Sequence, residues 1–448
     1  METFEDFVKG LIKILNIKQD IEKLTINEQQ KFISKINEYL YTNYEGIGTT
    51  HELDEDFEYL SDFHKYWENN HKKILNPHID EEKCELAAEV LHKIYKEYGE
   101  NPFSELYDTH KLTLEEICKV RFLTANQDFR GSRDFKFLAK IYHDDPSIFD
   151  LQFISEQPDI FLSKLKMGKL SQTDKRIKYA KTVVNYLLEK VIEPYELFEY
   201  FKNDYLELRK NLIELKGSGY GQKKVDMFLR DMHLLGVWGK GMNFDKIDVA
   251  SDINTIKVAL RTGILKTDIL LLSSFLDIFC YQYGLMDEFT AKAWRKVWEI
   301  WQKKYPEETI ESPSQIDYLI YRLIGKEFCK DRLFLFKCTK YNHEFYWHTG
   351  RNKTCQICYK ETKKRIPALL VFRDLPCKYK EGHIAIQSNS VRDSILPKTD
   401  ECPFIEVCKP REKNFKKLNP PKSISILGRT GWTTAYTKKD EGGGGLMA

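Results

Sequence analysis

Residues 212–257 read LIELKGSGYGQKKVDMFLRDMHLLGVWGKGMNFDKIDVASDINTIK. Their apolar spacing predicts a helix that ends in a turn containing Gly217, Gly219 and Gly221. A second helix is expected to begin near Lys223. A glycine-rich backbone can turn tightly and leave its N–H groups exposed at the start of the following helix, where they can bind an anion such as a phosphate. The stretch therefore predicts two helices joined by a phosphate-binding turn, in a mainly helical protein.

Two kinds of reactive side chain accompany this turn. Lys223 and Lys224 open the second helix, and Asp252 follows 29 positions after Lys223 in an otherwise apolar stretch. A lysine in this position can meet a phosphate or act as a nucleophile when its amine is neutral. The simpler alternatives are that the lysines only cap the helix or bind phosphate, and that Asp252 caps a helix over 253–262. Asp248 is the alternative carboxylate.

Two short motifs in this segment resemble a known family. Residues 219–226, GYGQKKVD, resemble the G-x-G-x-K-x-A-D motif of the lysine-bearing helix-hairpin-helix/Gly-Pro-Asp DNA glycosylases, and residues 249–252, VASD, resemble its V-P-V-D motif. Ala250 stands where the family has proline. The spacing between the two motifs is longer than in the common members of the family, and it resembles the longer spacing of archaeal 8-oxoguanine glycosylases. The resemblance spans about 110–330, although its specific motifs occupy only some forty residues.

The resemblance implies a two-lobed helical fold and an enzyme that excises a base from DNA and has AP-lyase activity. Lys223 would be the nucleophile and Asp252 the electrostatic or acid–base partner. The DNA contacts that it implies are Gly217, Gly219, Gly221, Gln222, Lys224 and, from a comparable helix end, Gln127. The expected partner is double-stranded DNA with a damaged or modified base, with an oxidised purine as the first expectation.

Other functions fit parts of the same sequence. Gln127 could be an ordinary residue at the end of a helix. The chain could also be a non-enzymatic DNA- or RNA-binding protein that grips phosphates with the hairpin and a metal module, or a protein that modifies RNA. The sequence leaves open which base would be excised, and whether the role would be repair or defence against modified foreign DNA.

Seven of the ten cysteines lie between residues 329 and 408. In an intracellular chain such clustering favours metal binding over disulfides. The series Cys338-x4-His343-x11-Cys355-x2-Cys358 offers three thiolates and one imidazole, which suits a tetrahedral zinc site, and it resembles zinc-ribbon or treble-clef modules. His348 is the rival fourth ligand, and free buried thiols or another metal are the alternatives.

A second cysteine set consists of Cys329, Cys377, Cys402 and Cys408. Many members of the resembling family have a [4Fe–4S] loop that ends in Cys-x5-Cys, as Cys402 and Cys408 do, and Cys329 looks like its start. The resemblance thus implies an iron–sulfur cluster, with a second zinc or no metal as alternatives. Cys84, Cys118 and Cys280 lie in apolar stretches and are expected in the core.

The net charge of +2 hides a strong asymmetry. Residues 1–100 contain 12 Lys/Arg and 22 Asp/Glu, whereas residues 329–448 contain 24 Lys/Arg and 12 Asp/Glu. We expect an acidic helical accessory domain at 1–105 that could bind a protein partner, a glycosylase-like core at 106–328, a basic metal-binding module at 329–425 that could contact a polyanion, and a flexible tail at 426–448.

Local patterns predict the main elements. Helical spacing occurs at 4–15, 27–39, 82–98, 176–188 and 195–216, and Thr113 and Glu116 have the spacing of a capping box. Short strands are expected at 333–336, 344–347 and 368–372. No apolar run is long enough to span a membrane and the N-terminus does not resemble a signal peptide, so an intracellular location is expected.

Overall fold

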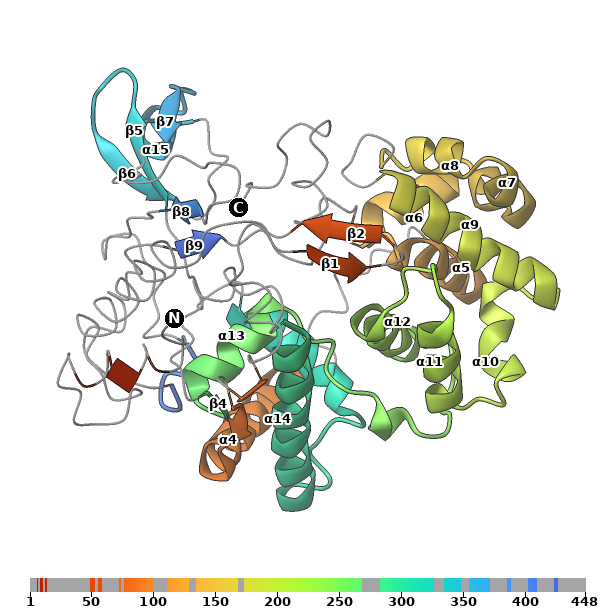
Figure 1. The fold of residues 1–448 in the computed structure, drawn as a ribbon, viewed down its shortest axis with the longest axis horizontal. Coiled ribbons are helices and arrows are strands. Elements are labelled where there is room, and N and C mark those ends of the chain that lie inside the picture. Colours follow the sequence, from red (N-terminus) through yellow and green to blue (C-terminus); the bar gives the residue numbers. More distant parts are fainter. Residues whose placement is uncertain are drawn as a thin grey trace. The chain divides into compact units, whose positions relative to one another are not determined.

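The computed structural model is mainly helical, with a few short antiparallel strands (Figure 1). This confirms the expected mainly α class. The structure describes residues 76–99, 111–128, 134–167, 173–267, 283–325, 334–347, 354–370 and 402–408, with short pieces at 6, 9–10, 13, 49–52, 55–58, 72–73, 385–387 and 423–425.

The chain divides into two compact units, each built from segments that are distant in sequence. The first unit consists of residues 1–87, 253–293 and 321–448, and the second of residues 88–252 and 294–320. Neither unit coincides with a predicted domain, because the expected core at 106–328 contributes to both. Helices α4 (Glu81–Tyr98) and α14 (Tyr283–Lys304) each begin in the first unit and end in the second.

The second unit is helical and has one large apolar core. Aromatic and aliphatic side chains between Ile117 and Ile247 form this core, and many of them are fully buried. The elements that pack around it are α5 (Leu114–Ala125), α6 (Phe135–Asp144), η3 (Pro146–Phe149), α7 (Leu151–Glu156), α8 (Pro158–Lys164), α9 (Thr173–Lys190), η4 (Pro194–Glu196), α10 (Leu197–Tyr200), α11 (Tyr205–Glu214), α12 (Gln222–Leu234) and η5 (Phe244–Lys246).

Side chains of the expected types begin these helices. The Thr113 hydroxyl accepts a hydrogen bond from the Glu116 N–H, and the Glu116 carboxylate accepts one from the Thr113 N–H at 2.8 Å, so the predicted capping box is confirmed. Asp134 caps α6 and Asp150 caps α7 in the usual way, each accepting a backbone N–H at 2.8 Å. The start of α12 differs, because its N-cap residue is Gly221 and has no side chain to offer.

The helical pattern predicted over 195–216 is broken in the structure. α10 ends at Tyr200 and α11 begins at Tyr205. Lys202 and Asn203 between them have φ angles of +57° and +55°, which no α-helix permits. Asp204 then restarts the helix by accepting the Leu206 N–H at 2.8 Å, so a local cap overrides a continuous apolar spacing.

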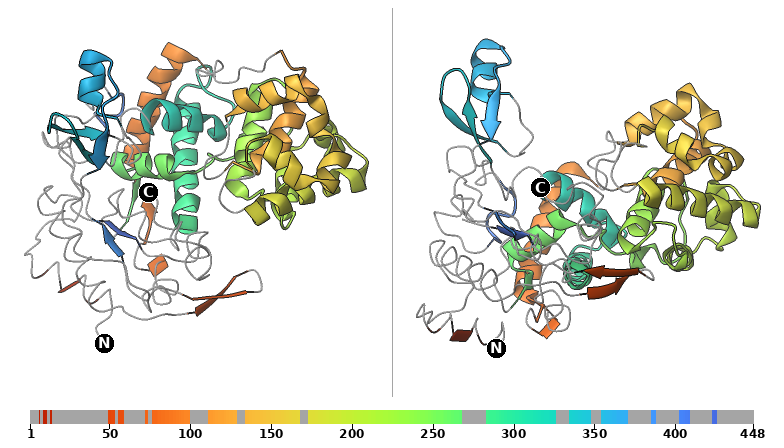
Figure 2. Two further views of the ribbon diagram at one scale, coloured as in Figure 1. Left: turned by 90° about the horizontal axis from the view of Figure 1, so that it is seen from above. Right: turned by 45° about the horizontal axis from the view of Figure 1, so that its top comes forward.

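The first unit contains the strands. β5 (Phe334–Cys338) pairs antiparallel with both β6 (Glu344–Trp347) and β7 (Ala368–Leu370), giving the order β6-β5-β7. Both views of Figure 2 show helix α15 (Gln356–Thr362) beside this small sheet. The other pairs are β1 (Thr49–Glu52) with β2 (Glu55–Glu58), β3 (His78–Ile79) with β4 (Leu265–Lys266), and β8 (Ala385–Gln387) with β9 (Ser423–Ser425). Helix α13 (Ile253–Thr262) also belongs to this unit.

Among the helices that the structure describes, none has the length and apolar character needed to cross a membrane.

Several expectations lie wholly or mostly outside the described residues. The expectations outside the described residues are the helices at 4–15 and 27–39, the tail at 426–448, His348, Cys280, Cys329 and Cys377.

Candidate active site and candidate metal centre

The hairpin turn depends on its glycines for steric reasons. Gly217 and Gly219 have φ angles of +79° and +75°, in the left-handed region that favours glycine. A Cβ atom on Gly219 would stand 2.4 Å from a ring carbon of Tyr179, too close for any side chain. The Tyr220 ring is buried and its hydroxyl donates to the Phe122 carbonyl of α5, which holds the turn against that helix.

The two lysines of the turn have different surroundings. Gln222 and Lys223 are exposed on the first turn of α12. Lys224 points inward, where its Nζ donates to the Asn126 carbonyl at 2.6 Å and lies 5.7 Å from the centre of the Tyr179 ring. Burial lowers the pKa of Lys224 to about 8, although the charge of Asp128 opposes the shift. The predicted nucleophile is thus the accessible lysine, and its neighbour ties the hairpin to the end of α5.

The two candidate carboxylates also differ. Asp248 accepts from Arg295 Nε at 2.6 Å, and the same guanidinium donates to the Asp245 carbonyl at 3.0 Å. Asp248 is therefore committed to an ion pair within the second unit. Asp252 is half-buried and directly precedes α13.

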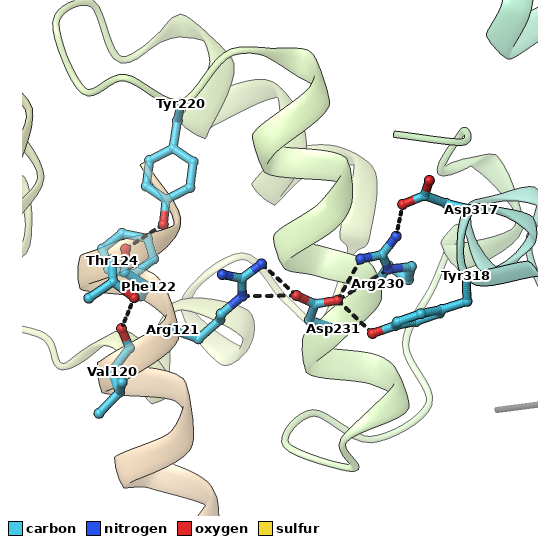
Figure 3. Close-up of polar contacts among 9 residues, drawn as sticks. All are labelled: Val120, Arg121, Phe122, Thr124, Tyr220, Arg230, Asp231, Asp317 and Tyr318. Atoms are coloured by element: carbon cyan, nitrogen blue, oxygen red, sulfur yellow. Dashed lines mark hydrogen bonds and ion pairs between the residues drawn. The ribbon is translucent and has the colours of Figure 1, made fainter. Parts of the chain in front are cut away.

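A buried charge network lies between α5, α12 and the segment after α14 (Figure 3). Asp231 is fully buried and accepts from Arg121 Nε and Nη2, both at 2.8 Å, from Arg230 Nη2 at 2.9 Å and from the Tyr318 hydroxyl at 2.9 Å. Arg230 also donates to Asp317, a buried residue between η8 (Pro313–Gln315) and η9 (Tyr318–Gly325). This network fixes the position of Asp317.

Asp317 is a buried carboxyl with a raised pKa. Burial raises the pKa of Asp317 to about 6, while the Arg230 guanidinium acts against the increase. The negative charge of Asp252 raises the pKa of Asp317 further, and the ammonium of Lys223 lowers it. The local sequence around Asp317 contains no motif that would have revealed it.

Gln127 is placed differently from its expected role. Its side chain is fully buried, and its amide nitrogen donates to the Arg176 carbonyl at 3.1 Å. Arg176 in turn donates from Nη1 to the Gln127 carbonyl at 3.0 Å. This burial argues against Gln127 as a direct DNA contact and agrees with the alternative, an ordinary residue at the end of a helix.

The second site is a cluster of three thiols and one imidazole near the small sheet. Cys338 ends β5, His343 precedes β6, and Cys355 and Cys358 lie at the start of α15. One ligand atom from each of the four lies within 4.8 Å of all the others, and the three cysteines are buried. The Tyr341 N–H points at Cys338 Sγ at 3.4 Å and the Cys358 N–H at Cys355 Sγ at 3.5 Å.

The spacing of these atoms fits a tetrahedral zinc ion. Typical zinc–ligand bonds put two sulfurs about 3.8 Å apart and a sulfur and a nitrogen about 3.6 Å apart. The Sγ atoms of Cys338 and Cys358 are 3.8 Å apart, and His343 Nε2 lies 3.5 Å from Cys358 Sγ, although only 3.0 Å from Cys355 Sγ. Burial and the neighbouring thiols raise the pKa of Cys358 to about 12. A bound cation would lower this pKa, because it stabilises the thiolate form.

The second cysteine set is described only in part. Cys402 and Cys408 are both buried within one run of turns, and Lys83 Nζ donates to the Val407 carbonyl at 3.0 Å. Cys84 and Cys118 are fully buried in the apolar interior, which confirms their expected core role.

No protein-family model matches the chain, and no curated protein matches it either.

Proposed function

We propose that this protein is a DNA base-excision glycosylase with AP-lyase activity, with the two-lobed fold of the helix-hairpin-helix/Gly-Pro-Asp superfamily. The main support is the exposed Lys223 amine, which lies on the first turn of α12 directly after a glycine hairpin. Gly217 and Gly219 of that hairpin have left-handed φ angles, and Asp252 is half-buried directly before α13. Cleavage of a glycosidic bond followed by imine formation requires an amine nucleophile and an acid that stabilises the charge on the sugar.

The proposed reaction begins with extrusion of the damaged base from the duplex. As the N-glycosidic bond breaks, positive charge develops on the sugar, and the Asp252 carboxylate stabilises that charge. The nitrogen of Lys223 forms a bond to C1′ while the base leaves with the bonding electron pair. Opening of the sugar ring gives an imine, and loss of a proton from C2′ then expels the 3′ phosphate.

The hairpin would position the DNA. Gly217, Gly219 and Gly221 form the turn whose backbone N–H groups would face a phosphate, and Gln222 is exposed beside them. The α12 N-terminus adds its positive dipole end at the same point. Lys224 would act indirectly, because its amine already bonds to the Asn126 carbonyl.

The metal centre would have a structural role in this proposal. Cys338, His343, Cys355 and Cys358 would hold one zinc ion, which would supply folding energy to a module with a small apolar core. Cys329, Cys377, Cys402 and Cys408 are proposed as the ligands of a [4Fe–4S] cluster or a second metal.

Borohydride trapping on duplex DNA with an abasic site tests the proposal, because borohydride reduces the imine to a permanent crosslink. The wild-type protein should crosslink, Lys223→Gln should not, and Lys224→Gln should crosslink as the matched neighbour. On duplexes with an excisable base, Asp252→Asn should slow release about 100-fold or more, whereas Asp248→Asn should retain most activity.

Other results of these assays would contradict parts of the proposal. Trapping by Lys223→Gln at the wild-type level would overturn the nucleophile assignment, and its loss only in Lys224→Gln would move the role to Lys224. A wild-type protein that neither crosslinks nor releases any base from a panel of damaged duplexes would favour the non-enzymatic binding protein. Preference for RNA over DNA in competition would favour an RNA-directed function.

A further inference from the structure

The metal module has two exposed aromatic rings next to its ligands. Tyr341 and Tyr359 are 55% and 39% exposed. Tyr341 lies in the turn between Cys338 and His343, and Tyr359 directly follows Cys358. Because the four ligand atoms lie within 4.8 Å of one another, both tyrosines are attached to the same compact cluster.

A cation accompanies each of these rings. Lys340 Nζ lies 5.0 Å from the centre of the Tyr341 ring, and Lys363 Nζ lies 6.0 Å from the centre of the Tyr359 ring. The described residues of the module, 334–347 and 354–370, contain six Lys/Arg and two Glu, all of them exposed. The module surface is therefore cationic with aromatic rings set among the charges.

The position of Tyr341 is determined by the metal-site turn. Its backbone N–H points at Cys338 Sγ, and its ring is nearly parallel to the His343 imidazole, with an interplanar angle of 13° and centroids 6.1 Å apart. The Cys338 N–H donates to the His343 carbonyl at 2.9 Å and closes the same turn. Holding the ring in one place before binding reduces the entropy lost when a ligand stacks on it.

We propose that the exposed surface of the metal module around Tyr341 and Tyr359 binds a nucleic-acid strand with unpaired bases. The Tyr341 and Tyr359 rings would stack on bases, and Lys340, Lys363 and the neighbouring cations would meet the phosphates. Aromatic rings among cations are the combination that binds single strands with little sequence preference, because every base has a flat face and every nucleotide a charge. The inference does not depend on catalysis by Lys223.

The full-length zinc-loaded protein tests this inference by fluorescence anisotropy with a labelled thymidine oligonucleotide. The double variant Tyr341→Ala/Tyr359→Ala should bind at least tenfold more weakly than wild type. Tyr200→Ala is the matched control and should bind like wild type: Tyr200 is 51% exposed and lies 4.9 Å from Lys190 Nζ, but it belongs to the other unit. Zinc content, measured for every variant, should be unchanged.

Two further arms separate the outcomes. Lys340→Gln/Lys363→Gln should bind more weakly and reduce the slope of log affinity against log salt. Binding of the tyrosine double variant within twofold of wild type, with zinc retained, would overturn the inference, and so would equal weakening by Tyr200→Ala. Stronger competition by an acidic peptide than by the oligonucleotide would point to a protein partner instead.

Borohydride trapping separates this inference from the proposed activity. The tyrosine double variant should still crosslink to abasic duplex at saturating concentration. If the wild type never crosslinks but the tyrosine variants lose oligonucleotide binding, the strand-binding surface stands and the glycosylase proposal fails.

Discussion

Replacing Asp231 by asparagine tests the buried charge network most directly. Asp231 is fully buried and receives both guanidinium groups, from Arg121 and Arg230, as well as the Tyr318 hydroxyl. Asparagine keeps the shape but removes the negative charge, and its amide turns N–H donors toward groups that are donors themselves. The side chains of Arg121 and Arg230 are only 11% and 5% exposed, so water cannot replace the lost charge well.

The expected cost follows from this burial. Removing one partner of a buried ion pair typically costs about 3–5 kcal/mol, because the remaining charge is left uncompensated. The linked contact of Arg230 with Asp317 offsets part of this loss, so we expect Asp231→Asn to lower the free energy of unfolding by about 3 kcal/mol. Tyr318→Phe removes the hydrogen bond from the Tyr318 hydroxyl to Asp231 and should cost about 1 kcal/mol.

Urea denaturation at neutral pH, followed by circular dichroism, measures these differences. The control is Lys246→Gln, which removes an ion pair to Asp245 whose side chains are 55% and 44% exposed. Exposed pairs contribute little, so this variant should change stability by less than about 0.5 kcal/mol. A loss below about 1 kcal/mol in Asp231→Asn, or a loss no larger than that of Lys246→Gln, would refute the reasoning.

Three further predictions concern the turn, the metal site and the buried acid. Gly219→Ala should lower the free energy of unfolding by about 2–4 kcal/mol, because the site has a positive φ and the added Cβ would clash with the Tyr179 ring. Gly221 has no neighbouring atom within 4 Å of an added Cβ, so Gly221→Ala should cost about 1 kcal/mol at most in the same urea titration. Cys355→Ser should lose zinc in metal analysis of the purified protein, whereas Cys118→Ser, away from the ligand cluster, should retain it. The pKa of Asp317 is raised from 3.8 to about 6, so its contribution to stability is present below pH 3.8 and is lost as the pH rises through about 6. Asp317→Asn should therefore flatten the dependence of the free energy of unfolding on pH by up to about 3 kcal/mol. Equal slopes for the variant and the wild type in urea titrations from pH 4 to 7 would contradict this.

Local patterns predicted the elements that depend on near neighbours. The spacing of Thr113 and Glu116 predicted a capping box because both partners lie within one helical turn. The cysteine and histidine spacing predicted the metal cluster because a strand, a turn and a helix start bring these ligands together over a short stretch of chain. The break after Tyr200 was missed, since the apolar spacing continues through residues whose backbone leaves the helix.

The sequence by itself determined the mainly helical class, the glycine hairpin and the Cys/His cluster, because each follows from the spacing of residues that are close in sequence. Only the tertiary structure decided that Lys224 turns inward and that Gln127 is buried. It also brought Asp231 and Tyr318, 87 positions apart, into one buried charge network with Arg121. The physical reason is that desolvation and long-range pairing depend on which distant segments pack together, and no local spacing specifies that packing.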